Sequence, residues 1–381
     1  MLALGRALAG RGHDVTLQTW HRWREAVERE GMRFAPAPEY DVFPSGEAVI
    51  DFYGAAHRAT LDTLALVREL EPDVVVADIL TLAPGLAGEL AGVPVATLVP
   101  HVLPWGQDDF PVYSLGARLP RSAAGRKLWR ALAPIARRGA EQGRQELNAL
   151  RSGLGLPSLT HLHGGISREL SLIATLPELE YPRDQWPPNA HVIGPLMWEP
   201  AAAAITPPPG NGPVVLVAPS TAQDREQLLL RSALAALRHI EARVIATYNR
   251  RLPAGPLPMA ANVRVVDWLS YAKTMPACDV VICHGGHGTL VRALTSGCAV
   301  VVWPAAGDMA ENAARVDWAG AGVRIPRRLL SPAAVHGALA RAIGEPGLRR
   351  TAIGIASAQA ARPDPAQRGA ELVEQLAGPP R

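Results

Sequence analysis

The sequence has 381 residues, of which 48% are hydrophobic and 19% are charged, and its formal net charge is +3. This composition is typical of a folded globular protein, and the length suits two domains of about 150 to 200 residues each. The small net charge, with no basic stripe interleaved with aromatic residues, argues against a nucleic-acid partner. No apolar run approaches the roughly 20 residues that cross a bilayer, so we do not expect membrane association.

The three cysteines, Cys278, Cys283 and Cys298, do not have the spacing of metal ligands. Their odd number argues against a disulfide framework. Residues 1–10 lack the basic start, long apolar middle and cleavage site of a secretory signal. We therefore expect a cytoplasmic protein.

The N-terminal half alternates between helical and strand patterns. Apolar residues recur at helical spacing from Leu2 to Leu8, and Gly10 and Gly12 end this first helix. The alternation that follows predicts a parallel sheet with helices on both faces. The expected elements are a strand over 14–18, a helix over 20–30, a strand over 32–35, a loop to Gly46, a helix over 55–70, a strand over 74–78, a helix over 83–91 and a strand over 94–99.

The chain begins inside a helix, whereas a doubly wound α/β unit places a strand before it. We therefore expect the N-terminal sheet to be short of one strand. Such a strand with its loop takes about 10 to 15 residues. On this interpretation Met1 is an internal methionine of a longer protein.

Residues 118–151 are arginine-rich and helical, with Leu128, Trp129, Leu132 and Ile135 on the apolar side. A basic amphipathic helix of this kind either binds an anionic membrane surface or lines a cleft. We favour the helix that lines a cleft. Two further short strands are expected over 170–174 and 191–194.

A linker over 199–212 divides the chain. It contains four consecutive alanines, three consecutive prolines and Gly210-Asn211-Gly212, which continue neither a helix nor a central strand. We expect an N-terminal domain over 1–198 and a C-terminal domain over 213–381, with the last helix packing back on the N-terminal domain. The second domain is expected to contain strands over 213–218, 243–247, 263–268 and 280–283 and a helix over 225–239.

The clearest site pattern lies in residues 277–312. The apolar run 279–283 leads into His284-Gly285-Gly286-His287-Gly288-Thr289, and a helical pattern follows over 290–297. Glycines in such a turn let the backbone approach a ligand, and the first amides of the helix bind phosphate. A second apolar run, 299–303, brings Pro304 and the polar loop 308–312 to the same sheet edge. The sequence therefore predicts a phosphate site between two strand ends.

The linker, the glycine turn and the polar loop together resemble the inverting, nucleotide-sugar-dependent glycosyltransferases of family 1, of the antibiotic or macrolide type. The resemblance covers essentially the whole chain. Its specific part is the order of Val266-Asp267-Trp268-Leu269, the motif at 284–289, Pro304 and residues 308–316. It implies an α/β protein of the GT-B fold, in which two Rossmann-like domains face a central cleft.

The resemblance also implies an activity. It is the transfer of a hexose from a UDP-sugar or dTDP-sugar donor to a hydroxyl of a small apolar acceptor, without a cofactor. No carboxylate cluster suited to magnesium lies at the glycine turn, so we expect no metal requirement. Preplaced donors and a helix N-terminus would instead stabilise the charge that grows on the leaving diphosphate.

Roles for individual residues follow from the same resemblance. Trp268 would stack on the nucleotide base, and the backbone of Leu269 would pair with the base edge. Asp308 would bind hydroxyls of the sugar. The residues expected at the diphosphate are Ser220, Thr221, His284, Gly286, Gly288 and Thr289.

Three donor positions differ from the family pattern. Tyr271 and Met309 stand where the family commonly has Gln, and Arg292 stands where its Glu accepts the ribose hydroxyls. An arginine has no acceptor atom. The choice between UDP and dTDP, and between a hexose and a deoxysugar, therefore stays open.

The reaction needs a general base to take the proton of the acceptor hydroxyl. In the family this base is a His in the loop after the first strand, steadied by an Asp that Asp78 matches; the alternative is that Asp78 caps the next helix. No residue matches the His, whose position would precede Met1, and His13 lies at the wrong end of its strand and is interpreted as a turn residue. The chain as written is therefore expected to be inactive or slow, and a longer polypeptide that begins upstream should be active.

Aromatic residues concentrate in the N-terminal half. His101 follows a strand at its carboxyl end and, with Trp105, is a candidate for the acceptor side; an ordinary loop position is equally compatible. Further candidates, for which filling the core is an equal alternative, are Trp20, Trp23, Phe52, Tyr53, Phe110 and Trp129.

Two other function classes stay open. A sugar-nucleotide epimerase on the same fold would act on the donor without an acceptor site. An auxiliary protein that keeps the fold but lacks the base would bind and activate a partner transferase. The pattern around Trp268 and His284 favours the transferase.

Overall fold

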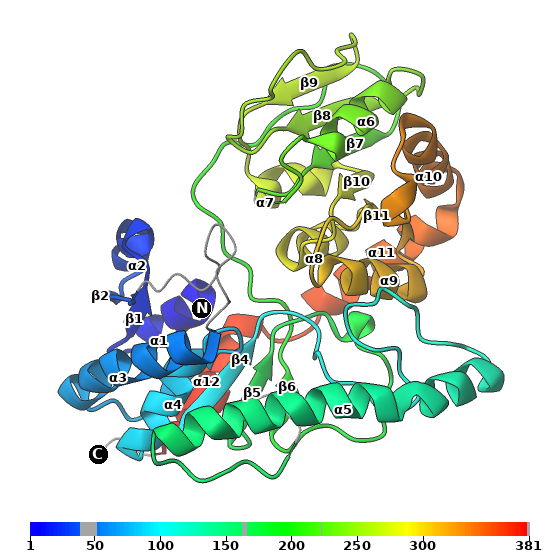
Figure 1. The fold of residues 1–381 in the computed structure, drawn as a ribbon. Helices are drawn as coiled ribbons and strands as arrows, with labels where there is room; N and C mark the ends of the chain where they lie inside the picture. The colour runs from blue at the N-terminus through cyan, green and yellow to red at the C-terminus, as the bar shows by residue number, and fades with distance from the viewer. Residues whose placement is uncertain (39–51, 162–165, 222, 379–381) are drawn as a thin grey trace.

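The computed structural model describes residues 1–38, 52–161, 166–221 and 223–378. Within these ranges the chain forms two α/β halves, one built on residues up to about 192 and one on residues from 214 (Figure 1). The loop to Gly46 that the sequence predicts and the side chain of Phe52 lie outside the described residues. Among the described residues, no helix has the length and apolar character needed to span a membrane.

The strands are short, and all of their pairings are parallel. The N-terminal half has a four-stranded sheet in the order β3-β4-β5-β6 and a separate ladder of β1 and β2. The C-terminal half has one six-stranded sheet in the order β12-β11-β10-β7-β8-β9. The strands are β1 (Thr16–Thr19), β2 (Arg33–Pro36), β3 (Val75–Asp78), β4 (Val95–Val99), β5 (Leu170–Ile173), β6 (Ala190–Val192), β7 (Val214–Ala218), β8 (Arg243–Thr247), β9 (Val263–Val266), β10 (Val280–Cys283), β11 (Ala299–Val302) and β12 (Gly322–Arg324).

Helices connect these strands and cover the sheets. They are α1 (Leu2–Gly10), α2 (Arg24–Arg29), α3 (Phe52–Leu70), α4 (Leu82–Ala91), α5 (Ala123–Gly153), α6 (Leu228–Leu237), α7 (Tyr271–Thr274), α8 (His287–Thr295), α9 (Met309–Ala319), α10 (Pro332–Gly344), α11 (Pro346–Ala360) and α12 (Pro365–Ala377). Short 3-10 turns are η1 (His21–Trp23), η2 (Pro177–Leu179), η3 (Met275–Ala277) and η4 (Arg327–Leu329).

The C-terminal sheet is buried on both faces. Along β7, Val214 and Leu216 join a core under α8, α9 and α11, whereas Val215 and Val217 join the core under α6 and α10. Successive side chains of a strand point to opposite faces, so a strand with helices on both sides is apolar throughout. This confirms the parallel sheet with helices on both faces that the apolar runs predict.

The expected single N-terminal sheet is present as two ladders. Among the described residues β1 and β2 pair only with each other, and β3 pairs only with β4. Helix α4 packs so closely on the four-stranded sheet that a side chain on Gly88 would lie 2.7 Å from Val95 and 3.3 Å from Val75. The other face of this sheet is covered by α1 and α12, which share one core with Leu98 and Leu172 (Figure 1).

Several predicted boundaries differ from the observed ones. The strand expected over 14–18 is β1 at Thr16–Thr19, and the helix expected over 20–30 is split into η1 and α2. Strand β9 ends at Val266, so Trp268 lies in the following loop. The helix expected from 118 begins at Ala123, because the side chain of Ser122 accepts a hydrogen bond from the Gly125 amide and caps it.

The segment between β6 and β7 contains the predicted linker and runs between the two halves (Figure 1). It lies along the loop that follows β9: Ser270 N–H donates to the Ala203 carbonyl over 2.9 Å, and Arg264 donates to the Thr206 carbonyl. The linker is thus held against the C-terminal half beside Trp268.

Candidate active site

The glycine turn joins β10 to α8, and only glycine fits its first position. Gly285 has a φ of +82°, and a side chain there would lie 2.7 Å from Val302 Cγ1. Gly286, the N-cap of α8, and Gly288 are different, since a side-chain atom on either would meet nothing within 4 Å. Helix geometry leaves the first amides of α8 without intrahelical partners. These amides therefore border open space, and such a helix N-terminus is suited to bind an anion.

The polar loop after β11 is fastened to the glycine turn. Strand β11 pairs with β10 so that Val302 lies beside Cys283, which puts the two following loops at one sheet edge. Asn312 of α9 donates through Nδ2 to the Gly285 carbonyl over 2.9 Å and to Asp308 Oδ2 over 3.0 Å. The predicted meeting of the two strand ends is thus present, with Asp308 at the N-cap of α9.

His284 is engaged entirely within the protein. The Ser220 N–H donates to its Nδ1 over 2.9 Å, and its Nε2 lies 3.1 Å from Asp224 Oδ2. The His284 side chain is 1% exposed. An Nδ1 that accepts a hydrogen bond leaves the proton on Nε2, which donates to Asp224. In this arrangement His284 fixes the loop after β7 and has no free N–H for a phosphate.

Asp224, which the sequence analysis does not single out, completes this connection. Its two oxygens accept the amides of Leu228 and Leu229 at the start of α6, over 2.9 and 3.0 Å. Burial acts to raise the pKa of this carboxyl, but the hydrogen bonds from His284, Leu229 and Leu228 outweigh burial and lower it. Asp224 thus ties α6 to the glycine turn as a carboxylate.

An arginine lies against Trp268, the residue expected to stack on the nucleotide base. The guanidinium of Arg250 lies over the Trp268 ring, with Cζ 4.6 Å from the ring centre, and Trp268 Nε1 is buried without a hydrogen-bond partner among the described residues. Leu269 is part of the core. Tyr271, at the changed Gln position, is hydrogen-bonded to Asn249 instead of facing outward.

Arg292, which stands where the family has the Glu that accepts the ribose hydroxyls, has an acidic partner. Its Nε lies 3.8 Å from Glu199 Oε2 in the linker. Glu199 also accepts from the Ser270 hydroxyl and from the Ala272 amide, the latter over 3.2 Å. Position 292 therefore has a carboxylate beside it, supplied by a different segment of the chain.

The residues predicted for the acceptor side lie in the N-terminal half. His101 follows β4, and its Nδ1 donates to the Val102 carbonyl over 2.7 Å. The Tyr113 ring lies 6.2 Å from the His101 ring. Trp105 is partly buried, and its carbonyl accepts from Arg183 over 2.7 Å.

Asp78 stands at the carboxyl end of β3, as the sequence predicts. Its Oδ1 accepts the Leu80 amide over 2.9 Å, and α4 begins only at Leu82 without a side-chain cap. Asp78 therefore forms a local turn and does not cap the helix. Its charge also acts on the Met1 amino group. His13 lies in the turn before β1 and pairs with Glu374.

A buried ionic cluster joins the two halves next to His101. Arg315 of α9 donates to Glu311 over 2.8 Å and to Glu180, which follows η2, over 3.1 Å. Glu180 also accepts the Leu103 amide over 2.6 Å and pairs with Arg183. The cluster therefore holds the loop after β4 against α9. The sequence does not predict this ionic cluster, because its members come from three distant segments.

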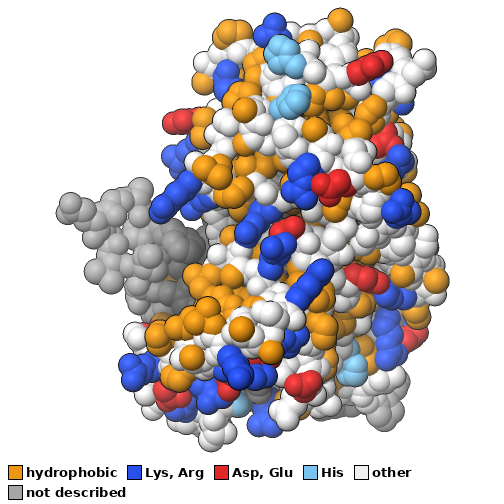
Figure 2. All heavy atoms as spheres, turned by 90° about the vertical axis from the view of Figure 1, so that its right-hand side faces the viewer, with side chains coloured by type: hydrophobic (Ala, Val, Ile, Leu, Met, Phe, Trp, Pro, Cys, Tyr) orange, Lys and Arg blue, Asp and Glu red, His pale blue; other side chains and the backbone are white. Residues whose placement is uncertain are grey.

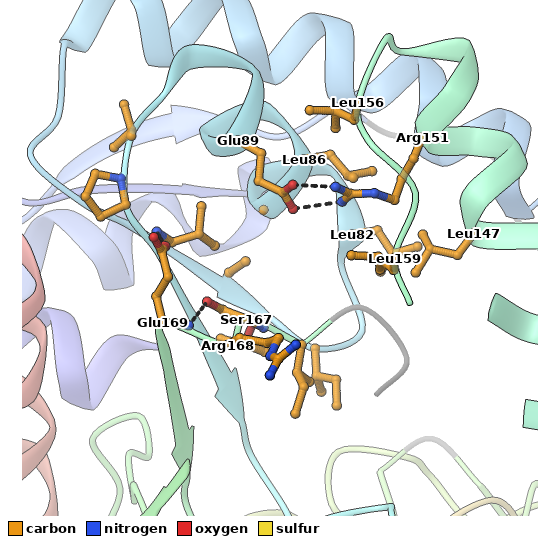
Figure 3. Close-up of a pocket in the computed structure, with 18 of the residues that line it drawn as sticks. Leu82, Leu86, Glu89, Leu147, Arg151, Leu156, Leu159, Ser167, Arg168 and Glu169 are labelled. Carbon is orange, nitrogen blue, oxygen red and sulfur yellow. Dashed lines mark hydrogen bonds and ion pairs between the residues drawn. The ribbon is translucent and has the colours of Figure 1, made fainter. Parts of the chain in front are cut away.

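One pocket among the described residues lies away from the glycine turn. It has a volume of about 530 Å³ and lies between α4, the end of α5 and the loop before β5. Figure 3 shows Glu89 and Arg151 pointing toward each other at its edge, where they pair over 2.7 Å. Of the predicted site residues only Asp78 lines it. This pocket is therefore separate from the glycine turn.

Comparison with known proteins identifies the family. Residues 231–376 match the family described as "Erythromycin biosynthesis protein CIII-like, C-terminal domain". The chain is 31% identical, over 99% of its own length and 96% of the relative's, to 4'-demethylrebeccamycin synthase of Lentzea aerocolonigenes. It is 28% identical to tylactone mycaminosyltransferase of Streptomyces fradiae over 83% of this chain and 66% of that one.

The chain belongs to the antibiotic-type glycosyltransferases of family 1. Solved glycosyltransferases of similar fold include that of kitacinnamycin, with a TM-score of 0.77, 23% identity and coverage of 98% of this chain and 94% of that one. The calicheamicin glycosyltransferase CalG4 has a TM-score of 0.73 and 21% identity over 98% and 93%. This antibiotic-type glycosyltransferase thus has the GT-B fold that the resemblance predicts.

The described part of the glycosyltransferase contains no group of three or more His, Cys, Asp and Glu side chains that could hold a metal ion. Thr289 lies in the first turn of α8, beside the backbone amides at the start of this helix. Ser220 and Thr221 lie in the loop that His284 fixes; the Ser220 hydroxyl accepts the Gln223 amide over 3.0 Å, and Thr221 is exposed.

Proposed function

We propose that this glycosyltransferase moves a hexose from a UDP-sugar or dTDP-sugar to a hydroxyl of a small apolar natural product, with inversion and without a metal. The observation that carries the proposal is the pair of contacts from Asn312, which hold Asp308 beside the open N-terminus of α8. An anion site and a carboxylate suited to hydroxyls thus lie side by side, as a sugar diphosphate requires.

The proposed chemistry is a single displacement. The acceptor oxygen bonds to the anomeric carbon as the bond from that carbon to the diphosphate breaks, and the bonding electrons leave with the diphosphate. The amides at the start of α8 face the growing negative charge and stabilise it. Asp78 is proposed to steady the base that receives the hydroxyl proton.

A solved glycosyltransferase of similar fold supports a nucleoside diphosphate sugar as the donor. The glycosyltransferase VinC, with a TM-score of 0.70 and 21% identity over 99% of this chain and 95% of that one, is described in complex with dTDP. In the present chain Trp268 and the pair of Arg292 and Glu199 would contact the nucleoside. We propose a nucleoside diphosphate sugar on this basis.

The test is a turnover assay with UDP-glucose, dTDP-glucose and a panel of hydroxylated polycyclic and macrolide acceptors. Slow transfer with inverted configuration, unchanged by a chelator, is the expected result, because no residue of this sequence matches the catalytic His of the family. Binding of a nucleotide without transfer, together with activation of a second transferase, would favour the auxiliary protein. Interconversion of the donor sugar without an acceptor would favour the epimerase.

A further inference from the structure

The two ends of the long helix α5 have different surroundings. The buried residues of this 31-residue helix are Leu147, Leu150 and Arg151, all of which lie in its last turns. Two of them, Leu147 and Arg151, line the pocket beside Glu89. Residues 123–138 instead extend toward the right-hand side of the molecule in Figure 1 and include no buried residue.

The apolar side of residues 123–138 faces outward. Leu128, Leu132 and Ile135 recur at i, i+4 and i+7, which places them on one side of the helix. All three side chains are exposed, and so is Ala131 between them. An apolar helix side normally packs on a core. The described residues leave this one largely uncovered.

Ion pairs on the opposite side hold the helix in this orientation. Arg126, Arg130 and Arg137 each lie two residues from one of the apolar side chains, which is about 200° around the helix. Arg126 and Arg130 pair with the buried Asp109 over 3.1 and 3.3 Å. Arg137 pairs with Asp108 over 2.6 Å. Because the loop after β4 binds the charged side of the helix, the apolar side points to solvent.

The charged residues around this apolar side have one sign. Between Pro111 and Ala140 the sequence has seven Lys and Arg residues and no Asp or Glu. Lys127 and Arg138 lie along one edge of the apolar side, both are exposed, and neither forms an ion pair with a described residue. The matching surface must therefore be negatively charged and must also take up apolar side chains. The interface of an anionic lipid bilayer has both properties.

We propose that residues 123–138 dock on an anionic membrane surface, with the apolar side in the interface and Lys127 and Arg138 at the lipid phosphates. A second copy of the chain fits less well, because two surfaces with cations alone repel each other. A protein partner would need both acidic residues and a groove shaped for this helix, whereas a fluid bilayer needs no groove. For this half of α5 the observed orientation thus favours the membrane surface over the cleft that the sequence suggested. The contact adds no step to the proposed reaction.

The test is sedimentation of the full chain with two kinds of vesicle: phosphatidylcholine alone, and equal parts of phosphatidylcholine and phosphatidylglycerol. The parent should bind the anionic vesicles about tenfold more tightly than the neutral ones, and added salt should weaken the binding. Leu128→Gln with Ile135→Gln should weaken binding to the anionic vesicles about tenfold. Lys127→Gln with Arg138→Gln should weaken it similarly and also reduce the effect of salt.

The matched control changes an exposed apolar and basic spot in the C-terminal half. Leu329 of η4 is 61% exposed, against 60% for Leu128, and it follows the exposed Arg328. Arg328→Gln with Leu329→Gln should bind both kinds of vesicle as the parent does. Every substituted side chain is exposed, so the unfolding midpoint in urea should change little in all of these variants.

A fluorescent dye locates the contact directly. The three native cysteines are buried, so an environment-sensitive dye can be attached at Ile135→Cys or at Leu329→Cys. Anionic vesicles should shift the emission to the blue at position 135 and leave it unchanged at position 329.

Three outcomes would overturn the proposal. The parent does not bind anionic vesicles, which leaves a protein as the occupant of this side of α5. The parent and both α5 double variants bind equally, with no shift of the dye at position 135. The parent forms a dimer in the ultracentrifuge that Leu128→Gln with Ile135→Gln dissociates, which assigns the surface to a second copy.

Discussion

Arg315 of α9 and Glu180 of the N-terminal half form an ion pair of 3.1 Å in which both side chains are less than 5% exposed. The guanidinium also lies over the Tyr181 ring, 4.1 Å from its centre. Burial, followed by the charge of Glu311, raises the pKa of Tyr181 to about 12. The boundary between the halves thus contains a buried, charged cluster whose members depend on one another.

Replacing Arg315 by Met should destabilise the protein strongly. The substitution leaves Glu180 and Glu311 buried beside a group that no longer carries charge, and removing one member of a buried pair costs about 3 to 5 kcal/mol. Urea unfolding would measure the loss. The exposed pair of Arg341 and Glu345 is the matched control, and Arg341→Met should change the unfolding midpoint little.

Replacing Asn312 by Ala should raise the KM for the donor and lower the stability of the protein only slightly. The substitution removes the two hydrogen bonds that fasten Asp308 to the glycine turn, and each is worth about 1 kcal/mol. Steady-state kinetics with the donor varied would measure the effect. An unchanged KM would show that Asp308 is held in place by other contacts.

Two glycines of the turn should respond in opposite ways. Gly285→Ala should destabilise the fold, because of its positive φ and the nearby Val302 methyl group at 2.7 Å. Gly288→Ala should leave stability unchanged or raise it, because the added methyl group meets open space inside a helix. The same methyl group would project toward the proposed anion site, so it should weaken binding of nucleoside diphosphates. Thermal unfolding and calorimetry together separate the two effects.

The stability that Asp224 provides should depend on pH in a defined direction. Its pKa is lower in the folded protein than the ordinary value of 3.8, so its contribution is fully present above that value and is lost as the pH falls through the folded value. The difference in unfolding free energy between the parent and Asp224→Asn should therefore be largest near pH 7 and shrink below about pH 4. A difference independent of pH would contradict this role.

The sequence predicts the elements that are apolar along their whole length. Strands β7, β8 and β10 match their predicted ranges within one residue, because a strand buried on both faces is a continuous apolar run. Ends set by local hydrogen bonds are less predictable. Helix α8 begins three residues before its first apolar position, because the glycine turn and not the periodicity determines where it starts.

The site was predictable only in part. Strand order and a motif suffice to bring Asp308 beside the glycine turn. Asp224, Glu180 and Glu199 could not be found in this way, since each acts through a partner at least 60 residues away in the chain.

The long helix α5 has exposed apolar residues on one side. Leu128 and Ile135 are 60% and 68% exposed. In Figure 1 the N-terminal part of α5 extends toward the right-hand side of the molecule. Figure 2 shows this side, where hydrophobic atoms are interspersed with Lys, Arg, Asp and Glu. The apolar side predicted for this helix is thus largely uncovered among the described residues.

Helices α1 and α12 share one core, although almost the whole chain separates them. A side chain on Gly369 of α12 would lie 3.0 Å from Leu4 of α1. During synthesis on the ribosome, the half made first therefore cannot complete its core until the last helix has emerged. The half made second has all its strands in residues 214–324, but its core also includes Val335 of α10 and Ala352 of α11, so it too is completed only near the end of the chain. We thus expect neither half to reach its full stability before α11 and α12 have been made.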